Sequence, residues 1–355
     1  MADPRALGSL LNCLRGHVPS DIDWQSVIAV ANRTLTTGTL AYRLREGDHW
    51  PRLPGDVQTF LSAIHERTAL RNARLSAQLA EAVLCLNGEG ITPILLKGAA
   101  LQRTRHAAGG EGRLLSDLDL MVPVSTMPHA IACLARIGYR LQSDDIAPES
   151  ASVLYRECDV GMIDLHCRMK PPRPRIGHDD LASASAPVAI GEGMALLPSP
   201  TAQALILILH DQLQDRDYWR GLIDMRHLLD LDVLARTPQG IDWNRLLDYF
   251  SVGYPRTALL VQLFTARQLL ATPVPVDLVR GWRPRFQYWR RMTQARWPVL
   301  MAPMTYLTLA LDPPRFHAAP HVGVANEGPS PRAGTLDRLA GTLRRFMRQK
   351  APGKV

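Results

Sequence analysis

The sequence contains few cysteines and no paired cysteine motif. Only five occur among 355 residues, at positions 13, 85, 133, 158 and 167, and no two of them form a C-x-x-C motif. An odd number without short spacing argues against the disulfide framework of a secreted protein. We therefore expect a protein of a reducing compartment.

A long apolar run is also missing. Residues 299–311 form the longest late apolar stretch, which contains a proline and is too short to cross a bilayer. The first residues, Met-Ala-Asp-Pro, lack the basic and then apolar order of a signal peptide. These absences argue against a membrane span and predict a cytoplasmic protein.

Acidic residues are scarce at one end of the chain. Residues 280–355 contain 14 Lys and Arg but only 3 Asp and Glu, a net charge of +11. The whole chain carries +8, so residues 1–279 carry about −3. Such a segment can bind an acidic partner, an anionic lipid or nucleic acid, although a solvated helix surface has the same composition. Because no aromatic residue follows Phe346, a stacking surface for single-stranded nucleic acid is not expected.

Periodicity predicts an α+β protein without internal repeats. Helical spacing dominates residues 1–88, and strand and helix signals then alternate through residues 94–167, which predicts a small mixed sheet backed by helices. A Pro- and Arg-rich stretch from residue 170 is predicted to begin a linker that reaches about residue 200. The predicted parts are an N-terminal helical region (1–88), a core (89–175), a C-terminal helical region (176–275) and a basic helical extension with a flexible loop (276–355).

The most informative motif is an Asp-x-Asp pair next to an apolar run. If residues 118–122 form a strand, the two-residue period places Asp117 and Asp119 on one face and turns Leu118, Leu120 and Val122 into the core. Two carboxylates on a rigid strand edge are suited to a hard divalent cation. The alternative interpretation is a solvated strand end before a turn.

Two neighbouring segments favour the metal-site interpretation. Residues 94–101 are predicted to form a buried strand that runs into a helix, with Lys97 and Gly98 at the junction, where backbone amides can approach an anion. Residues 162–166 form a second alternating segment that places Asp164 and His166 on one face. Three carboxylates on two strands that face a Lys-Gly turn are typical of a two-metal phosphoryl-transfer site.

With these motifs the chain resembles the DNA polymerase beta-like nucleotidyltransferase superfamily. It is most similar to the bacterial branch of uncharacterised nucleotidyltransferases, whose pattern runs LKG, then R-x-x-S/G-D-I-D-L-L-V, then I-D-L-H. The resemblance covers about residues 20 to 275. It implies that Asp117 and Asp119 are metal ligands, that Asp164 is a third carboxylate and a general base, and that Lys97 and Gly98 lie near the triphosphate. The Gly-Ser of the wider superfamily is replaced here by Lys97 and Gly98, and residues 107–112 resemble an insertion.

Further candidate residues surround these motifs, each with a structural alternative. Arg113 suits a phosphate or a carboxylate of the strand edge, or else pairs with Glu111. His166 orients Asp164 or contacts the substrate, or else is a half-buried structural histidine. The remaining candidates are Ser116 for the nucleotide, Lys170, Arg173 and Arg175 for the triphosphate or as a solvated linker, and His210 and Asp224 for the acceptor side of the site or as a structural pair.

The sequence thus predicts a metal-dependent nucleotidyltransferase. We expect it to use Mg2+ or Mn2+ and to move an NMP group, AMP foremost, from an NTP to a hydroxyl group on a small molecule, peptide or protein. One alternative is a phosphotransferase with the same metal site. Another is a catalytically silent protein that keeps the fold and binds a partner, against which the three carboxylates argue. The basic tail is expected to bind an acidic partner, and nucleic acid is not expected as a partner.

Overall fold

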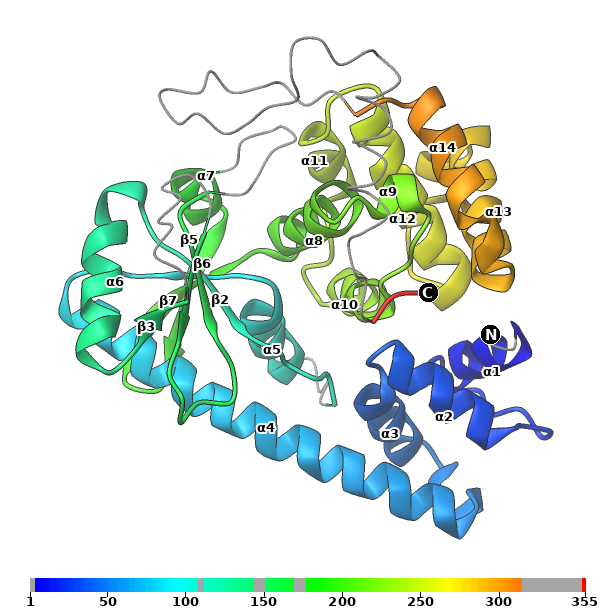
Figure 1. The fold of residues 1–355 in the computed structure, drawn as a ribbon, viewed down its shortest axis with the longest axis horizontal. Helices are drawn as coiled ribbons and strands as arrows, with labels where there is room; N and C mark the ends of the chain where they lie inside the picture. Colours follow the sequence, from blue (N-terminus) through cyan, green and yellow to red (C-terminus); the bar gives the residue numbers. More distant parts are fainter. Residues whose placement is uncertain (1–3, 108–111, 143–150, 169–176, 315–352) are drawn as a thin grey trace.

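The computed structural model describes residues 4–107, 112–142, 151–168, 177–314 and 353–355. A mixed sheet stands at one end of the molecule, and two groups of helices stand at the other (Figure 1). The predicted α+β class, a mixed sheet backed and flanked by helices, is confirmed.

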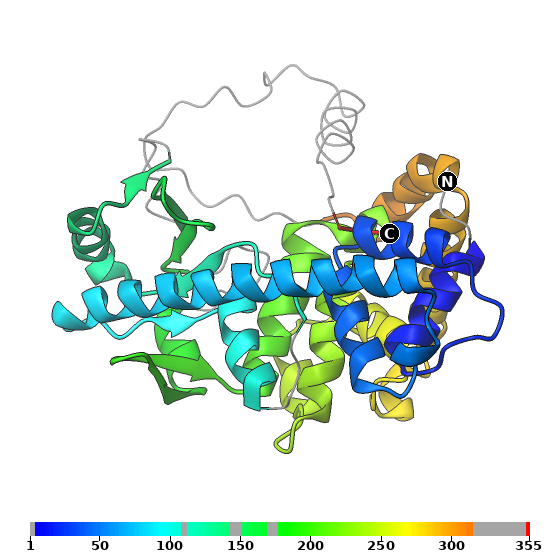
Figure 2. The ribbon, with the colours of Figure 1, turned by 90° about the horizontal axis from the view of Figure 1, so that it is seen from below.

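Four helices form the N-terminal region. They are α1 (Pro4–Leu14), α2 (Trp24–Arg33), α3 (Thr37–Glu46) and α4 (Gly55–Gly88), with a 3-10 turn at Trp50–Arg52. Asp23 caps α2, because its carboxylate accepts a hydrogen bond from the amide of Ser26 at 3.2 Å. Helix α4 has 34 residues, a length of about 51 Å, and runs from the other N-terminal helices to the sheet (Figure 1, Figure 2).

Within the described residues, seven strands form one sheet in the order β3-β4-β5-β2-β1-β7-β6. Strand β2 runs parallel to β5 and β1 runs parallel to β7, whereas the other neighbouring strands are antiparallel. The strands are β1 (Ile94–Leu95), β2 (Leu118–Met121), β3 (Arg140–Leu141), β4 (Ala151–Tyr155), β5 (Ile163–His166), β6 (Ser185–Ile190) and β7 (Gly193–Pro198).

The two faces of the sheet have different partners. Leu118 and Leu120 of β2 pack into a hydrophobic cluster with side chains of α4 and of α6 (Met127–Arg136), which follows a 3-10 turn at Val124–Thr126. Asp119 alternates with these leucines and therefore projects from the opposite face. Helix α5 (Lys97–Ala107) also packs against β2, and its first residue, Lys97, reaches Asp119. The period of β2 thus separates the core from the candidate site.

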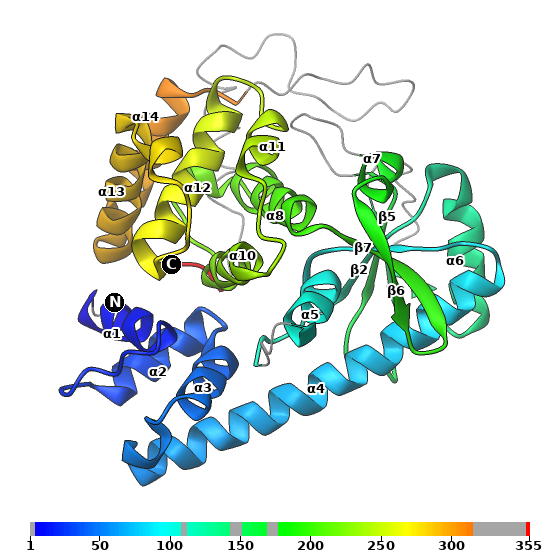
Figure 3. The ribbon, with the colours of Figure 1, turned by 180° about the vertical axis from the view of Figure 1, so that it is seen from behind.

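The C-terminal helices share one hydrophobic core with the N-terminal helices (Figure 3). Every residue of α8 is buried, which suits the apolar run Ala204–Ile208 that forms its second half. The elements are α7 (His178–Ala182), α8 (Pro200–Ile208), a π-helical turn (Leu209–Gln214), α9 (Asp217–Arg220), α10 (Met225–Arg236), α11 (Trp243–Asp248), α12 (Tyr254–Leu270), a 3-10 turn (Val276–Val279), α13 (Trp282–Arg296), a 3-10 turn (Pro298–Leu300) and α14 (Met301–Leu311).

The prediction of a linker up to about residue 200 is wrong. Residues 178–198 contain α7 and the hairpin of β6 and β7, and β7 pairs with β1 inside the sheet. Pro187 lies in β6, which is the edge strand, where a missing amide donor is tolerated. The helix predicted at residues 335–349 lies outside the described residues, as does the loop predicted at 313–331 beyond residue 314. Lys170, Arg173, Arg175 and Glu111 also lie outside them.

One disulfide occurs among the described residues, although the cysteine spacing did not predict it. Cys85 of α4 is joined to Cys133 of α6. Cys13, Cys158 and Cys167 do not form a disulfide within the described residues. None of the helices in the described segments is both long and apolar enough to span a bilayer.

Candidate active site

Strand β2 places two carboxylates at the sheet in different surroundings. Asp119 is within the strand and only 1% exposed. Asp117 lies just before the strand, is partly exposed and accepts a hydrogen bond from the hydroxyl of Ser116 at 2.7 Å. The pair therefore combines one buried carboxylate with one at the surface.

Strand β5 brings a third carboxylate to the same face. It runs parallel to β2 with Asp164 opposite Asp119 and His166 opposite Met121. His166 Nε2 lies 3.1 Å from Asp119 Oδ1. One ligand atom from each of Asp119, Asp164 and His166 falls within 4.8 Å of the others, a spacing that suits a metal ion. The structure thus brings these three predicted residues together.

Lys97 supplies a positive charge to this cluster. Its Nζ donates a hydrogen bond to Asp119 Oδ1 at 2.7 Å, and its side chain is 13% exposed. Its backbone has φ +40°, which is unusual for a residue other than glycine and costs conformational energy. This conformation lies between β1 and the first turn of α5, where it turns the lysine toward the carboxylates.

The electrostatics of the cluster leave an excess of negative charge. Burial alone would lower the pKa of Lys97, but the charges of Asp119, Asp117 and Asp164 raise it above its ordinary value. Burial opposes the ionisation of Asp119, yet Lys97 and His166 hold its pKa below the usual range. Burial and then the charges of Asp119 and Asp117 raise the pKa of Asp164. Three carboxylates therefore share one lysine, and their oxygens fit the ligand preference of Mg2+ or Mn2+.

Arg113 and Gly98 lie next to each other beside an ion pair with α10. The Nε atom of Arg113 lies 2.9 Å from both carboxylate oxygens of Asp230, and both side chains are buried. A Cβ atom on Gly98 would lie 3.2 Å from a guanidinium nitrogen of Arg113. Gly98 therefore makes room for a buried ion pair that joins the sheet region to α10.

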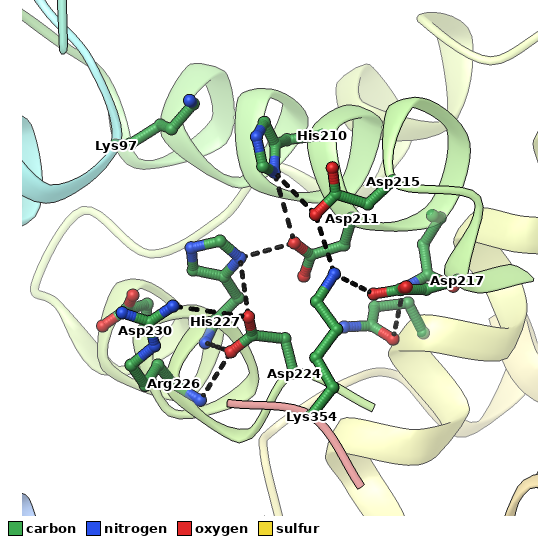
Figure 4. A network of polar contacts seen from close by, with 12 residues as sticks. Lys97, His210, Asp211, Asp215, Asp217, Asp224, Arg226, His227, Asp230 and Lys354 are labelled. Carbon is green, nitrogen blue, oxygen red and sulfur yellow. Dashed lines mark hydrogen bonds and ion pairs between the residues drawn. The ribbon is translucent and has the colours of Figure 1, made fainter. Parts of the chain in front are cut away.

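His210 and Asp224 belong to a second polar network (Figure 4). We call it the α8 network, and its members are His210, Asp211, Asp215, Asp217, Asp224 and His227. His210 Nδ1 lies 3.6 Å from Asp211 and 3.7 Å from Asp215. Asp224 is the N-cap of α10, because its carboxylate accepts hydrogen bonds from the amides of Arg226 and His227. His227 lies between Asp211 and Asp224. Its Nδ1 atom is 2.5 Å from Asp211 Oδ1 and 3.9 Å from Asp224 Oδ2.

The π-helical turn at the end of α8 contains Asp211, and Asp215 and Asp217 follow directly after it. Residues 209–214 are π-helical, and Arg216 follows with φ +65°. Such turns and left-handed residues are frequent at functional sites. The motifs in the sequence did not indicate Asp211, Asp215, Asp217, His227 and Lys354. Three aspartates within seven residues after an apolar helix were the available signal.

Helices α5 and α8 pack together and relate the two polar clusters. The side chains of Thr104 in α5 and Gln203 in α8 are hydrogen-bonded. Lys97 lies seven residues before Thr104 and His210 seven residues after Gln203. Figure 4 shows Lys97 on the same side of the α8 network as His210. The two helices thus present Lys97 and the α8 network at their common end.

No curated protein matches the chain. Among solved structures, ANT(2″)-Ia in complex with adenylyl-2″-tobramycin is 11% identical, with a TM-score of 0.34, and the match covers 45% of this chain and 87% of that one. An antigenic nucleotidyltransferase-like protein from Paracoccidioides brasiliensis is 16% identical, with a TM-score of 0.36, and the match covers 59% of this chain and 98% of that one. These scores are too low for the likeness to support an assignment.

The sequence itself supports a family assignment. Residues 20–271 match the family described as "Uncharacterised nucleotidyltransferase". The match includes α4, the sheet with its three carboxylates, and the α8 network, so it extends over both polar clusters. Because it covers well over half of the chain, the protein belongs to this nucleotidyltransferase family.

Proposed function

We propose that the protein transfers AMP from ATP to a hydroxyl group of an acceptor at the cluster of Asp117, Asp119, Asp164 and Lys97. The observation that carries this proposal is the facing position of Asp119 and Asp164 on two parallel strands, with the ammonium of Lys97 on Asp119. Three carboxylates with one lysine retain the negative charge that a divalent cation would balance.

Each residue has a part in this chemistry. Asp117, Asp119 and Asp164 would hold Mg2+ or Mn2+. The ion would neutralise charge on the triphosphate and lower the pKa of the acceptor hydroxyl. The acceptor oxygen would attack the α-phosphorus, and pyrophosphate would leave. Asp164, whose pKa is raised, would take the acceptor proton, and Lys97 would act as a point charge on the phosphates.

The positions of the two clusters suggest how the acceptor is held. Lys97 and His210 lie at the common end of α5 and α8, so an acceptor bound at the α8 network would be near the nucleotide. His210 is only partly buried, with 24% of its side chain exposed, and can therefore contact such a molecule. We assign the α8 network to the acceptor side of the proposed site.

The test is the transfer of label from ATP. The protein is incubated with Mg2+, a lysate of its source cell and ATP labelled either at the α- or at the γ-phosphate. Label from the α-position alone should enter an acceptor. Asp119→Asn should abolish transfer, whereas Asp248→Asn, a change at an exposed residue of α11, should leave it unchanged. Incorporation of γ-label would instead show a phosphotransferase, and no incorporation of either label would contradict transfer.

A further inference from the structure

The segment Gly353–Val355 is inserted between the carboxylates of the α8 network and the start of α10. Lys354 Nζ lies 2.7 Å from Asp215 Oδ2 and 2.6 Å from Asp217 Oδ2, and its side chain is only 6% exposed. Its partners precede it by 139 and 137 residues in the chain. Figure 4 shows the lysine reaching into the network from the side opposite His210.

The main chain of this segment pairs with residues 223–224 in an isolated antiparallel bridge. The amide of Ile223 donates to the carbonyl of Val355 at 2.9 Å, and the amide of Val355 donates to the carbonyl of Ile223 at 3.0 Å. Asp224 and Lys354 form an antiparallel bridge. Two backbone hydrogen bonds and one side chain in a charged site are the features by which an extended peptide is recognised at a strand edge.

The protein builds this site within residues 209–224. Asp215 follows the π-helical turn, and Asp217 opens α9 between the left-handed residues Arg216 and Gly221. Even with Lys354 in place, Asp217 Oδ1 and Asp211 Oδ2 are buried without a hydrogen-bond partner. Asp217 is 0% exposed, and burying a carboxylate without a cation is costly. The site therefore requires a cation and has unused acceptor atoms for one.

We propose that Ile223, Asp224 and the carboxylates of Asp215 and Asp217 form a binding site for an extended peptide that carries a lysine, and that Gly353–Val355 fill this site as a tethered copy of the ligand. We call it the lysine site. The ammonium binds the two carboxylates, and the peptide backbone pairs with Ile223. A peptide without the positive charge would leave Asp217 buried and unpaired, so the site selects lysine.

The lysine site lies next to the proposed site of AMP transfer, but peptide binding does not depend on that reaction. Asp215 also lies beside His210, which is at the Lys97 end of α8. A peptide bound there would be presented as the acceptor, and this extension rests on the proposed function. Binding itself needs neither a nucleotide nor a metal, so it can be measured without either.

The test uses a full-length double variant whose own segment is displaced. Gly353 has φ +81°, and a Cβ atom there would lie 3.1 Å from Leu35, so Gly353→Val disturbs the segment. Lys354→Ala removes the ammonium. The probe is the fluorescent amidated peptide Ala-Pro-Gly-Lys-Val, the control peptide has Met for Lys, and binding is measured by anisotropy without nucleotide.

We expect the double variant to bind the Lys peptide at least ten-fold more tightly than the wild-type protein does. The Met peptide should bind at least ten-fold more weakly, and Asp217→Asn in the double variant should cause a similar loss. Asp179→Asn, at a fully exposed carboxylate, is the matched control and should change nothing. Equal binding of both peptides, or no binding by a folded double variant, would overturn the proposal.

A second measurement covers the case in which the double variant does not fold. In the wild-type protein, the amide of Val355 donates a hydrogen bond to the carbonyl of Ile223, so we expect its hydrogen exchange to be slow. Millimolar Lys peptide should compete with the tethered segment and speed this exchange several-fold, whereas the Met peptide should not. Unchanged exchange with the Lys peptide would contradict the proposal. If Asp119→Asn abolishes label transfer but leaves peptide binding intact, the two proposals are separated.

Discussion

Asp164 of β5 lies directly opposite Asp119 of β2, so two carboxylates project from neighbouring parallel strands onto one face of the sheet. Asp119 has a lysine and a histidine as partners, whereas burial and then the repulsion of neighbouring carboxylates disfavour the charge of Asp164. The two carboxylates therefore differ in what their removal should do.

Asp164→Asn should lower turnover far more than nucleotide affinity and should leave stability unchanged or slightly raised. The reason is that the charge of Asp164 is disfavoured by burial and by Asp119 and Asp117, so its removal relieves repulsion. Kinetics and urea unfolding of the variant provide the measurements. A loss of several kcal/mol in the free energy of unfolding would show that Asp164 has a stabilising partner instead.

Lys97→Met should have the opposite effect on stability. It leaves the buried carboxylate of Asp119 without its nearest cation, and breaking a buried pair costs about 3–5 kcal/mol. The Michaelis constant for NTP should also rise, because a point charge on the phosphates is lost. Addition of Mg2+ should recover part of the thermal stability. If the variant is as stable as the wild-type protein and binds NTP equally well, the role of Lys97 is refuted.

Arg113→Gln should destabilise the protein without a matching effect on nucleotide binding. Its guanidinium pairs with the fully buried Asp230, and the variant would leave that carboxylate without this cation. We expect a loss of about 3 kcal/mol in the free energy of unfolding and an unchanged Michaelis constant for NTP. A raised Michaelis constant with normal stability would instead place Arg113 on a phosphate, which is one of the roles that the sequence pattern allows.

The buried His227 should make stability fall as the pH rises above neutrality. Burial alone lowers its pKa, but the charges of Asp211 and Asp224 raise it to about 9. A raised folded pKa means that the ion pair stabilises the protein fully below the unfolded value near 6.5, and that this contribution is lost as the pH rises through 9. The loss is at most about 3 kcal/mol.

The measurement is the melting temperature between pH 6 and pH 10 for the wild-type protein and for His227→Gln. The variant should be less stable at pH 6 and should lack the wild-type decline between pH 6.5 and 9. Parallel curves for the two proteins would contradict a charged His227.

Local patterns in the sequence were enough to predict the sheet that carries the three carboxylates. Alternation around Asp119 and Asp164 fixes which side chains enter the core, because the strand period is two. The β6 and β7 hairpin was missed, because Pro187 and the neighbouring glycines are typical of a loop unless the strand is known to be an edge strand.

Contacts between distant segments could not be predicted in this way. Arg113 meets Asp230 across 117 residues, and Lys354 meets Asp217 across 137 residues. Periodicity describes one element at a time and does not state which helix end meets which strand end. The structural role of Asp224, in contrast, could have been recognised from the sequence, because an aspartate directly before a helix is a known N-cap signal.

The most direct test of the metal and nucleotide site is the change in melting temperature caused by a non-hydrolysable ATP analogue together with Mg2+. A ligand at one hundred times its dissociation constant stabilises the folded state by about 2.7 kcal/mol. We predict an increase of several degrees for the wild-type protein and for Asp248→Asn when analogue and Mg2+ are both present, and no increase for Asp119→Asn. An equal increase in Asp119→Asn, or an increase in the wild-type protein that does not require Mg2+, would contradict the account.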